Sequence, residues 1–154
     1  MTRVLFVCLG NICRSPAGQG ILERMAKERG LDLEVASCAL GDWHLGKLPD
    51  PRMRKAAKKR GLDLKSRAAV FHPDFFEHFD YILAADRSIL AEIVRRAEGD
   101  YPTDHLYLIG DFSSKWPNQD IPDPYHGTEE DFELALDMLE EACEGFCKAL
   151  ATPS

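Results

Sequence analysis

The sequence predicts an α/β fold in which a parallel sheet is covered by helices on both faces. Short apolar runs alternate with amphipathic helical patterns along the 154 residues, as in βαβ units. The first run, Val4 to Val7, is unbroken and rich in β-branched and aromatic residues, which is typical of a strand buried on both faces. Ligands of such open sheets bind beyond the carboxyl ends of the strands, so the loops there are the candidate binding segments.

The first helix is expected to begin at Ser15-Pro16 and to end at Gly30. The Ser15 hydroxyl is able to cap free backbone amides, and the fixed φ of Pro16 suits a first helical turn. The same signals, an apolar period with a capping residue or a glycine at its end, identify the other elements. They are strands over 33–37, 79–85 and 106–109, and helices over 50–60, 86–98 and from 128 onward.

Two long segments between these elements have no helix or strand pattern. Segment 38–49 contains Trp43 and His44, and segment 110–127 contains three prolines. Irregular segments of this length in a compact domain usually have a function, so both are candidates for the walls of a site.

Composition and charge restrict the class of protein. The chain has the length of one domain, 1–154, with a sizeable core. Its net charge of −7 disfavours nucleic acid as a general partner. No apolar run approaches about 20 residues and no secretory signal is recognisable, so we expect a cytoplasmic monomer without membrane contact. Five cysteines, an odd number, do not indicate a disulfide framework.

Charge is distributed unevenly along the chain. Segment 129–144 is acidic and contains no Lys or Arg, whereas segment 52–60 is basic. Both segments can be interpreted as solvated helix faces. For the basic segment there is an alternative, a surface that attracts acidic phosphoproteins. The basic residues are Arg52, Arg54, Lys55, Lys58, Lys59 and Arg60.

The loop from Cys8 to Arg14 has the features of an anion-binding site. It joins the carboxyl end of a strand to the amino end of a helix, and Gly10 and Asn11 tolerate the positive φ that such a loop often needs. Loop amides and the helix dipole favour an anion there, and the Arg14 guanidinium fits two phosphate oxygens. The same field favours the thiolate of Cys8, which would be a nucleophile beside a bound phosphate.

The chain resembles the low-molecular-weight protein tyrosine phosphatase family. Cys8, Arg14 and Ser15 have the C-x5-R-S spacing of cysteine-dependent phosphatases, and the whole string from 7 to 16 is similar to the family's catalytic loop. Further similar motifs occur in the expected order along almost the whole chain. They are Asp42-Trp43-His44, Asp50-Pro51-Arg52, Phe79-Asp80-Tyr81-Ile82-Leu83 and Asp123-Pro124-Tyr125.

The resemblance implies a specific architecture and a phosphatase activity. The fold would be a three-layer sandwich with a four-stranded, flavodoxin-like sheet of order 2-1-3-4. The substrates would be phosphotyrosine-containing proteins or peptides, and phosphate- or vanadate-like oxyanions would inhibit. Neither a metal nor another cofactor is expected, because the loop amides and Arg14 compensate the phosphoryl charge.

Roles for individual residues follow from the same resemblance. Cys8 would form a phosphocysteine and Arg14 would clamp the phosphate. A general acid is needed for the leaving phenolate, and the residues alone leave Asp111, Asp120 and Asp123 as candidates. The Asp-Pro-Tyr motif selects Asp123, which would also activate water. The rest of the phosphate-binding loop comprises Leu9, Gly10, Asn11, Ile12, Cys13 and Ser15.

Some loop and wall residues have alternative interpretations. Ser15 is a helix cap, a hydrogen-bond donor to the nucleophilic sulfur, or both. Asn11 would hold the loop in shape, or merely tolerate the left-handed region. Cys13 would form a protective disulfide with Cys8, as in the family, or is a small packing residue. Trp43 and Tyr125 would form aromatic walls of the cleft.

Histidines and the remaining cysteines suggest no chemistry. Cys143 and Cys147 share a helix face and are expected to pack in the core, and Cys38 has no assigned role. His44 and His126 are expected to be surface residues.

Several positions depart from the usual family pattern and leave substrate preference open. They are Gln19, Ala39, Ala69 and His126. Protein-arginine phosphatases typically have Thr at the position of Ile12, so Ile12 favours phosphotyrosine. Arsenate reductases need further cysteines, and residues 39–142 contain none. A phosphopeptide-binding module without turnover is the alternative from outside the enzymes.

Overall fold

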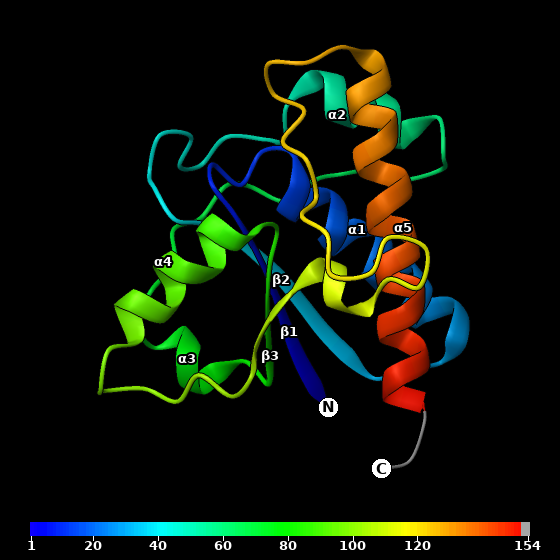
Figure 1. The fold of residues 1–154 in the computed structure, drawn as a ribbon. Coiled ribbons are helices and arrows are strands. Elements are labelled where there is room, and N and C mark those ends of the chain that lie inside the picture. Colours follow the sequence, from blue (N-terminus) through cyan, green and yellow to red (C-terminus); the bar gives the residue numbers. More distant parts are fainter. Residues whose placement is uncertain (152–154) are drawn as a thin grey trace.

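A computed structural model describes residues 1–151 and contains the predicted parallel sheet. The four strands are arranged in the order β2-β1-β3-β4, and every pair of neighbours is parallel (Figure 1). Helices cover both faces, which confirms the predicted three-layer sandwich (Figure 1). The strands are β1 (Thr2–Cys8), β2 (Leu33–Ala39), β3 (Tyr81–Ala84) and β4 (Leu106–Leu108).

The helices form two layers around the sheet. Figure 1 shows α1 and α5 on one side and α3 and α4 on the other. Between residues 1 and 151, no helix combines the length and the apolar character that crossing a membrane requires. The helices are α1 (Arg14–Arg29), α2 (Pro51–Lys58), α3 (Phe75–His78), α4 (Arg87–Ala97) and α5 (Glu129–Ala151), with a 3₁₀ helix η1 (Ile109–Phe112).

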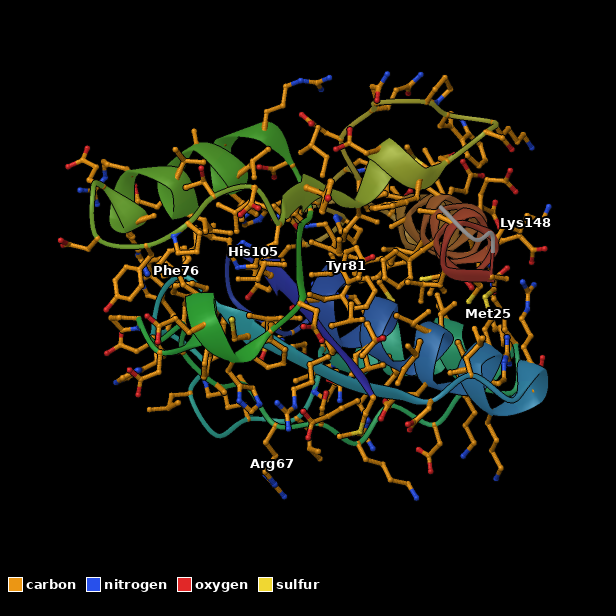
Figure 2. All side chains as sticks on the ribbon, turned by 90° about the horizontal axis from the view of Figure 1, so that it is seen from below. Met25, Arg67, Phe76, Tyr81, His105 and Lys148 are labelled. Carbon is orange, nitrogen blue, oxygen red and sulfur yellow. The ribbon has the colours of Figure 1, made fainter. Side chains whose placement is uncertain are left out.

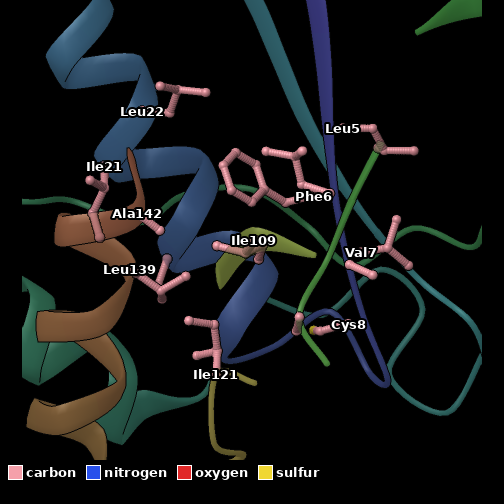
Figure 3. Packing of buried hydrophobic residues seen from close by; sticks show 14 of the residues in the cluster. Leu5, Phe6, Val7, Cys8, Ile21, Leu22, Ile109, Ile121, Leu139 and Ala142 are labelled. Atoms are coloured by element: carbon pink, nitrogen blue, oxygen red, sulfur yellow. The ribbon is translucent and has the colours of Figure 1, made fainter. Parts of the chain in front are cut away.

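The largest part of the core lies between β1, α1 and α5. Phe6 points from β1 toward α1, and Ile21 of α1 and Leu139 of α5 lie where these two helices face each other (Figure 3). The contact between strand and helix is close, because a Cβ on Gly18 would lie 2.7 Å from Cδ1 of Phe6. Only glycine permits this approach, which fixes the first turns of α1 against the end of β1.

A second aromatic contact joins β3 to the C-terminal helix. Tyr81 of β3, labelled in Figure 2, meets Phe146 of α5 edge to face, with ring centroids 5.1 Å apart. Such pairs contribute roughly 0.5–1.5 kcal/mol beyond burial of their area. Together with Phe6, this pair holds the sheet in a fixed relation to α1 and α5.

Two predicted helix caps are confirmed and one is wrong. Asp50 accepts a hydrogen bond from the amide of Arg52 at 2.8 Å, and Asp86 accepts one from Ile89 at 2.9 Å. Helix α1 begins at Arg14, however, and Ser15 does not cap it. The Ser15 oxygen lies instead against the side chains of Cys8 and Asn11, because the loop between β1 and α1 folds back over the first turn of the helix.

The remaining differences concern short elements. Neither α3 nor η1 was expected, since four residues are too few to show a helical period. Helix α2 ends at Lys58 rather than at residue 60, and Gly61 then adopts a φ of +81°. The carboxyl ends of the strands, which position the site, are predicted to within one residue or two.

Much of the basic segment is occupied within the protein. Arg60 lies within 3.3 Å of carboxylate oxygens of three residues of α5, and Lys59 lies 2.8 Å from Glu129. The partners of Arg60 are Glu133, Asp137 and Glu140. The basic segment and the acidic helix therefore pair with each other, so the six cations do not form one free docking surface.

Candidate active site

A cleft of about 360 Å³ opens at the carboxyl end of β1. Its floor is the loop between β1 and α1, and its walls come from the two long irregular segments of the chain. All but two of the predicted site residues line it; Asn11 and Ser15 lie behind the loop. The lining residues are Cys8, Leu9, Gly10, Ile12, Cys13, Arg14, Trp43, His44, Asp123, Tyr125 and His126.

Cys8 is the last residue of β1, and its sulfur is surrounded by hydrogen-bond donors. The side chain is 3% exposed. The amide of Asn11 donates to Sγ at 3.3 Å, and the Ser15 hydroxyl lies 2.9 Å from it. Donors of this kind stabilise a thiolate more than a thiol, because a hydrogen bond to an ionised acceptor is the stronger one.

The loop turns at Asn11, which has a φ of +57°. Gly10, also predicted to tolerate a positive φ, does not adopt one; it lies instead against His44, where a Cβ would be 3.0 Å from Cδ2. The Asn11 amide nitrogen donates to Ser15 at 2.6 Å and to Ser37 at 3.0 Å. These contacts stabilise the left-handed residue and hold the loop in shape.

Arg14 is buried at the base of the cleft with its guanidinium anchored on one side. Nη1 donates to Asp86 at 2.7 Å and to the carbonyl of Ile121 at 2.9 Å. Its side chain is 3% exposed, so the guanidinium is held by the protein rather than by water. Nη2 lies 3.8 Å from Asp123, on the cleft side.

Asp86 is a functional residue that the sequence pattern identifies only as a helix cap. Partial burial raises its pKa, but hydrogen bonds from Arg14, Ser88 and Ile89 outweigh that effect, and the pKa lies below its ordinary value. The carboxylate is therefore ionised at neutral pH and matches the charge of Arg14. The sequence did offer one signal for this role. Asp86 follows the end of β3, and because β3 is the parallel neighbour of β1, the residues after both strands lie at the same edge of the sheet.

The three candidate acids of segment 110–127 occupy different places. Asp111 accepts a hydrogen bond from the amide of Leu108 at 3.0 Å, and Asp120 is paired with Arg87 at 3.0 Å. Asp123 lines the cleft, and its side chain is 44% exposed. The amide of Tyr125 donates to the Asp123 carboxylate at 3.1 Å, which directs it over the loop.

Aromatic rings form the rim of the cleft. Trp43 is 63% exposed, and the ring of Tyr125 lies between those of His44 and His126, at 6.2 and 4.9 Å. His126 is exposed, as expected of a surface residue, whereas His44 is half-buried. Their position on the cleft was not expected, because neither the segment 38–49 nor the Asp-Pro-Tyr motif shows by spacing which side chains line a site.

The second cysteine of the loop differs from Cys8 in its surroundings. Cys13 is 4% exposed; burial raises the pKa of its thiol, and the charges of Asp50 and Cys8 raise it further. It is therefore a neutral thiol at physiological pH. Cys143 and Cys147 are buried on α5, as expected for packing residues.

Comparison with known proteins agrees with this fold. The sequence model described as "Low molecular weight phosphotyrosine protein phosphatase" matches residues 3–153. A fission yeast (Schizosaccharomyces pombe) protein of that name is 35% identical over 97% of both chains. A protein tyrosine phosphatase from Entamoeba histolytica superposes with a TM-score of 0.93 at 34% identity, covering 98% of this chain and 97% of that one.

A second similar structure is named for a different activity. It is a Drosophila arginine phosphatase, with a TM-score of 0.93 and 32% identity over the full length of both chains. The fold and these similarities define a protein phosphatase. Since the family model covers nearly the whole sequence, the chain belongs to the low molecular weight phosphotyrosine protein phosphatase family.

Asp86→Asn tests whether the partly buried carboxylate sets the affinity for oxyanions. Asparagine keeps the α4 cap but weakens the pairing with Arg14. Inorganic phosphate is expected to bind roughly tenfold more weakly by calorimetry, because a hydrogen bond to a charged group contributes about 1.5–3 kcal/mol. Asp120→Asn, which removes the exposed pair with Arg87, is the matched control. Unchanged binding in Asp86→Asn would contradict this role.

Proposed function

We propose that this protein hydrolyses phosphotyrosine in proteins or peptides through a phosphocysteine on Cys8. The observation that carries the proposal is the convergence of three groups on one cleft: the Cys8 sulfur, the Arg14 guanidinium and the Asp123 carboxylate. Nucleophile, anion clamp and acid are the parts that phosphoryl transfer to a sulfur requires.

In the first step the Cys8 thiolate attacks phosphorus while Arg14 and the loop amides hold the phosphate oxygens. The S–P bond forms and the P–O bond to the phenol breaks. Asp123 gives its proton to the leaving oxygen, so that tyrosine departs neutral. The Arg14 guanidinium lies 3.8 Å from the Asp123 carboxylate. A phosphate dianion bound to Arg14 neutralises that positive charge, and this favours the protonated form of Asp123 that the step needs.

In the second step the Asp123 carboxylate takes a proton from water as the water oxygen attacks phosphorus. The S–P bond breaks, inorganic phosphate leaves, and both Cys8 and Asp123 return to their starting states. The Ser15 hydroxyl, 2.9 Å from Sγ, stabilises the departing thiolate. Asp123 serves both steps because its proton transfer in the second step is the reverse of that in the first.

The rim supports an aryl phosphate as substrate. Trp43 and Tyr125 offer flat apolar surfaces on either side of the phosphate loop, and Ile12 adds an aliphatic side chain to the lining. A phenyl ring buries its faces against such walls, whereas the side chain of phosphoserine is too short to reach them. Phosphate- and vanadate-like oxyanions would compete for the same loop.

Arginine phosphatase activity is the second candidate, supported by the similarity to the Drosophila arginine phosphatase. A phosphoguanidinium would enter the same cleft and meet the same nucleophile. Ile12 favours phosphotyrosine over phosphoarginine, because its aliphatic side chain offers no hydrogen-bond acceptor to a guanidinium group.

Phosphotyrosine and phosphoarginine peptides, assayed side by side, test the proposal. We expect the tyrosine peptide to be turned over faster, without an effect of EDTA and with inhibition by vanadate. Cys8→Ser should lower the rate at least about thousandfold, since loss of a covalent nucleophile removes the pathway. Circular dichroism controls for folding, and a Cys8→Ser protein as active as the wild type would reject the proposal.

Asp123→Ala tests the general acid through its dependence on the leaving group. The loss in kcat should be roughly 10²–10⁴-fold for phenyl phosphate and much smaller for p-nitrophenyl phosphate, whose phenolate departs without a proton. Asp120→Ala is the matched control in the same segment. Equal losses for both esters would show that Asp123 does not protonate the leaving group.

We also propose that Cys13 protects Cys8 from irreversible oxidation. Cys8 sulfenic acid would condense with the Cys13 thiol to a disulfide and release water. After mild peroxide treatment, mass spectrometry is expected to find the Cys8–Cys13 bridge, and thiol reduction should restore activity. Sulfonic acid on Cys8 with Cys13 still reduced is the result that contradicts protection.

A further inference from the structure

A continuous series of hydrogen bonds connects the second turn of α1 to the sulfur of Cys8. The Ser37 hydroxyl donates to Oε1 of Gln19 at 2.6 Å. The side-chain nitrogen of Asn11, Nδ2, donates to the Ser37 hydroxyl at 3.0 Å and to the Ser15 hydroxyl at 2.6 Å. The Ser15 oxygen then lies 2.9 Å from Sγ of Cys8. None of the predictions from sequence gave Gln19 a role beyond being a departure from the family pattern.

The direction of this series is fixed at Asn11. Its Oδ1 accepts a hydrogen bond from the amide of Ala69 at 3.0 Å, so its nitrogen must face the two hydroxyls. Ser15 therefore accepts from Asn11 and keeps its own hydrogen for another acceptor. The sulfur of Cys8 at 2.9 Å is closer than the alternative, the carbonyl of Cys38 at 3.5 Å.

The direction is fixed a second time at Gln19. Its Nε2 donates to the carbonyl of Val35 at 3.4 Å. It also donates to Glu23, where this hydrogen bond opposes the rise in pKa that partial burial causes. Reversing the Gln19 amide would place its oxygen against two acceptors, so Oε1 must face Ser37. The Ser37 hydroxyl therefore donates its hydrogen to Gln19 and accepts a hydrogen bond from Asn11.

We propose that Gln19 is a positioning residue that keeps the Ser15 hydroxyl directed at the Cys8 sulfur. It supplies the acceptor for the Ser37 hydroxyl and thereby keeps the Ser37 oxygen available to the side-chain nitrogen of Asn11, whose amide group is oriented from its other end by Ala69. Each hydroxyl in the series can accept and donate at once, so a fixed acceptor at one end determines the donor at the other. The proposal rests on the proposed function only in taking Cys8 as the nucleophile.

The neutral amide of Gln19 suits this position better than a carboxylate. Both groups accept from Ser37, but a carboxylate cannot donate to Val35. The amide therefore satisfies the Ser37 hydroxyl with its oxygen and the carbonyl of Val35 with its nitrogen. Because Gln19 does not touch the cleft, its effect reaches the reaction only through the hydroxyls.

The pH dependence of alkylation of Cys8 by iodoacetamide, followed by mass spectrometry, tests this role. In Gln19→Leu the acidic limb of the profile should move to higher pH by about 0.5 unit, roughly a threefold loss of thiolate there. Gln19→Glu, which keeps an acceptor, should lie closer to the wild type. Gln119→Leu, at the chain's only other glutamine, removes an exposed side chain and should match the wild type.

Several results would overturn the proposal. One is a Gln19→Leu profile that coincides with the wild type, with or without a lower melting temperature, which would leave Gln19 a purely structural residue. Another is an equal displacement in Gln19→Leu and Gln19→Glu. If Gln19→Leu does not fold, Ser37→Ala breaks the next hydrogen bond; its profile should move in the same direction, and an unmoved profile counts against the proposal.

Alkylation also separates this proposal from the proposed function. It reports the ionisation of the Cys8 sulfur whether or not phosphotyrosine is turned over. A wild-type protein without phosphatase activity, but with a displaced Gln19→Leu profile, would reject the function and retain the role of Gln19. An active wild-type protein with coinciding profiles would retain the function and reject the role of Gln19.

Discussion

The ion pair between the buried Arg14 and the partly buried Asp86 is the interaction on which the site depends. A guanidinium with 3% exposure and no carboxylate beside it would cost several kcal/mol, so Arg14 could not remain at the base of the cleft alone. The fold supplies the partner because Asp86 follows β3, the neighbour of β1 in the sheet. The same strand order that builds the core therefore places a fixed positive charge beside the sulfur.

The catalytic loop needs a second support, because it contains a left-handed residue. Asn11 is held at its φ of +57° by hydrogen bonds to Ser15, Ser37 and Ala69, which belong to three different parts of the chain. The loop is therefore rigid before any anion binds. Such preorganised donors stabilise transition-state charge without reorganisation at the moment of reaction. The rim residues, by contrast, are exposed and free to adapt to a peptide.

Much of this arrangement follows from local sequence. The apolar run of β1, the Asp50 and Asp86 caps and the spacing of Cys8 and Arg14 depend on near neighbours, so patterns reveal them. Ser15 shows the limit: a serine before a proline predicts a cap, but Asn11 and Cys8 fold back onto its oxygen. The pairing of Arg60 with α5 and the inward turn of His44 depend on segments far apart in the chain, which no local pattern records.

The central claim is that the turn between β1 and α1 holds an oxyanion against an ionised sulfur. A crystal structure with vanadate tests it most directly. The account predicts vanadium bonded to Sγ of Cys8, with its oxygens on the loop amides and Arg14 and the Asp123 carboxyl above the apical oxygen. Vanadate bound elsewhere, or an Arg14 that has left Asp86 and turned away from the cleft, would contradict it.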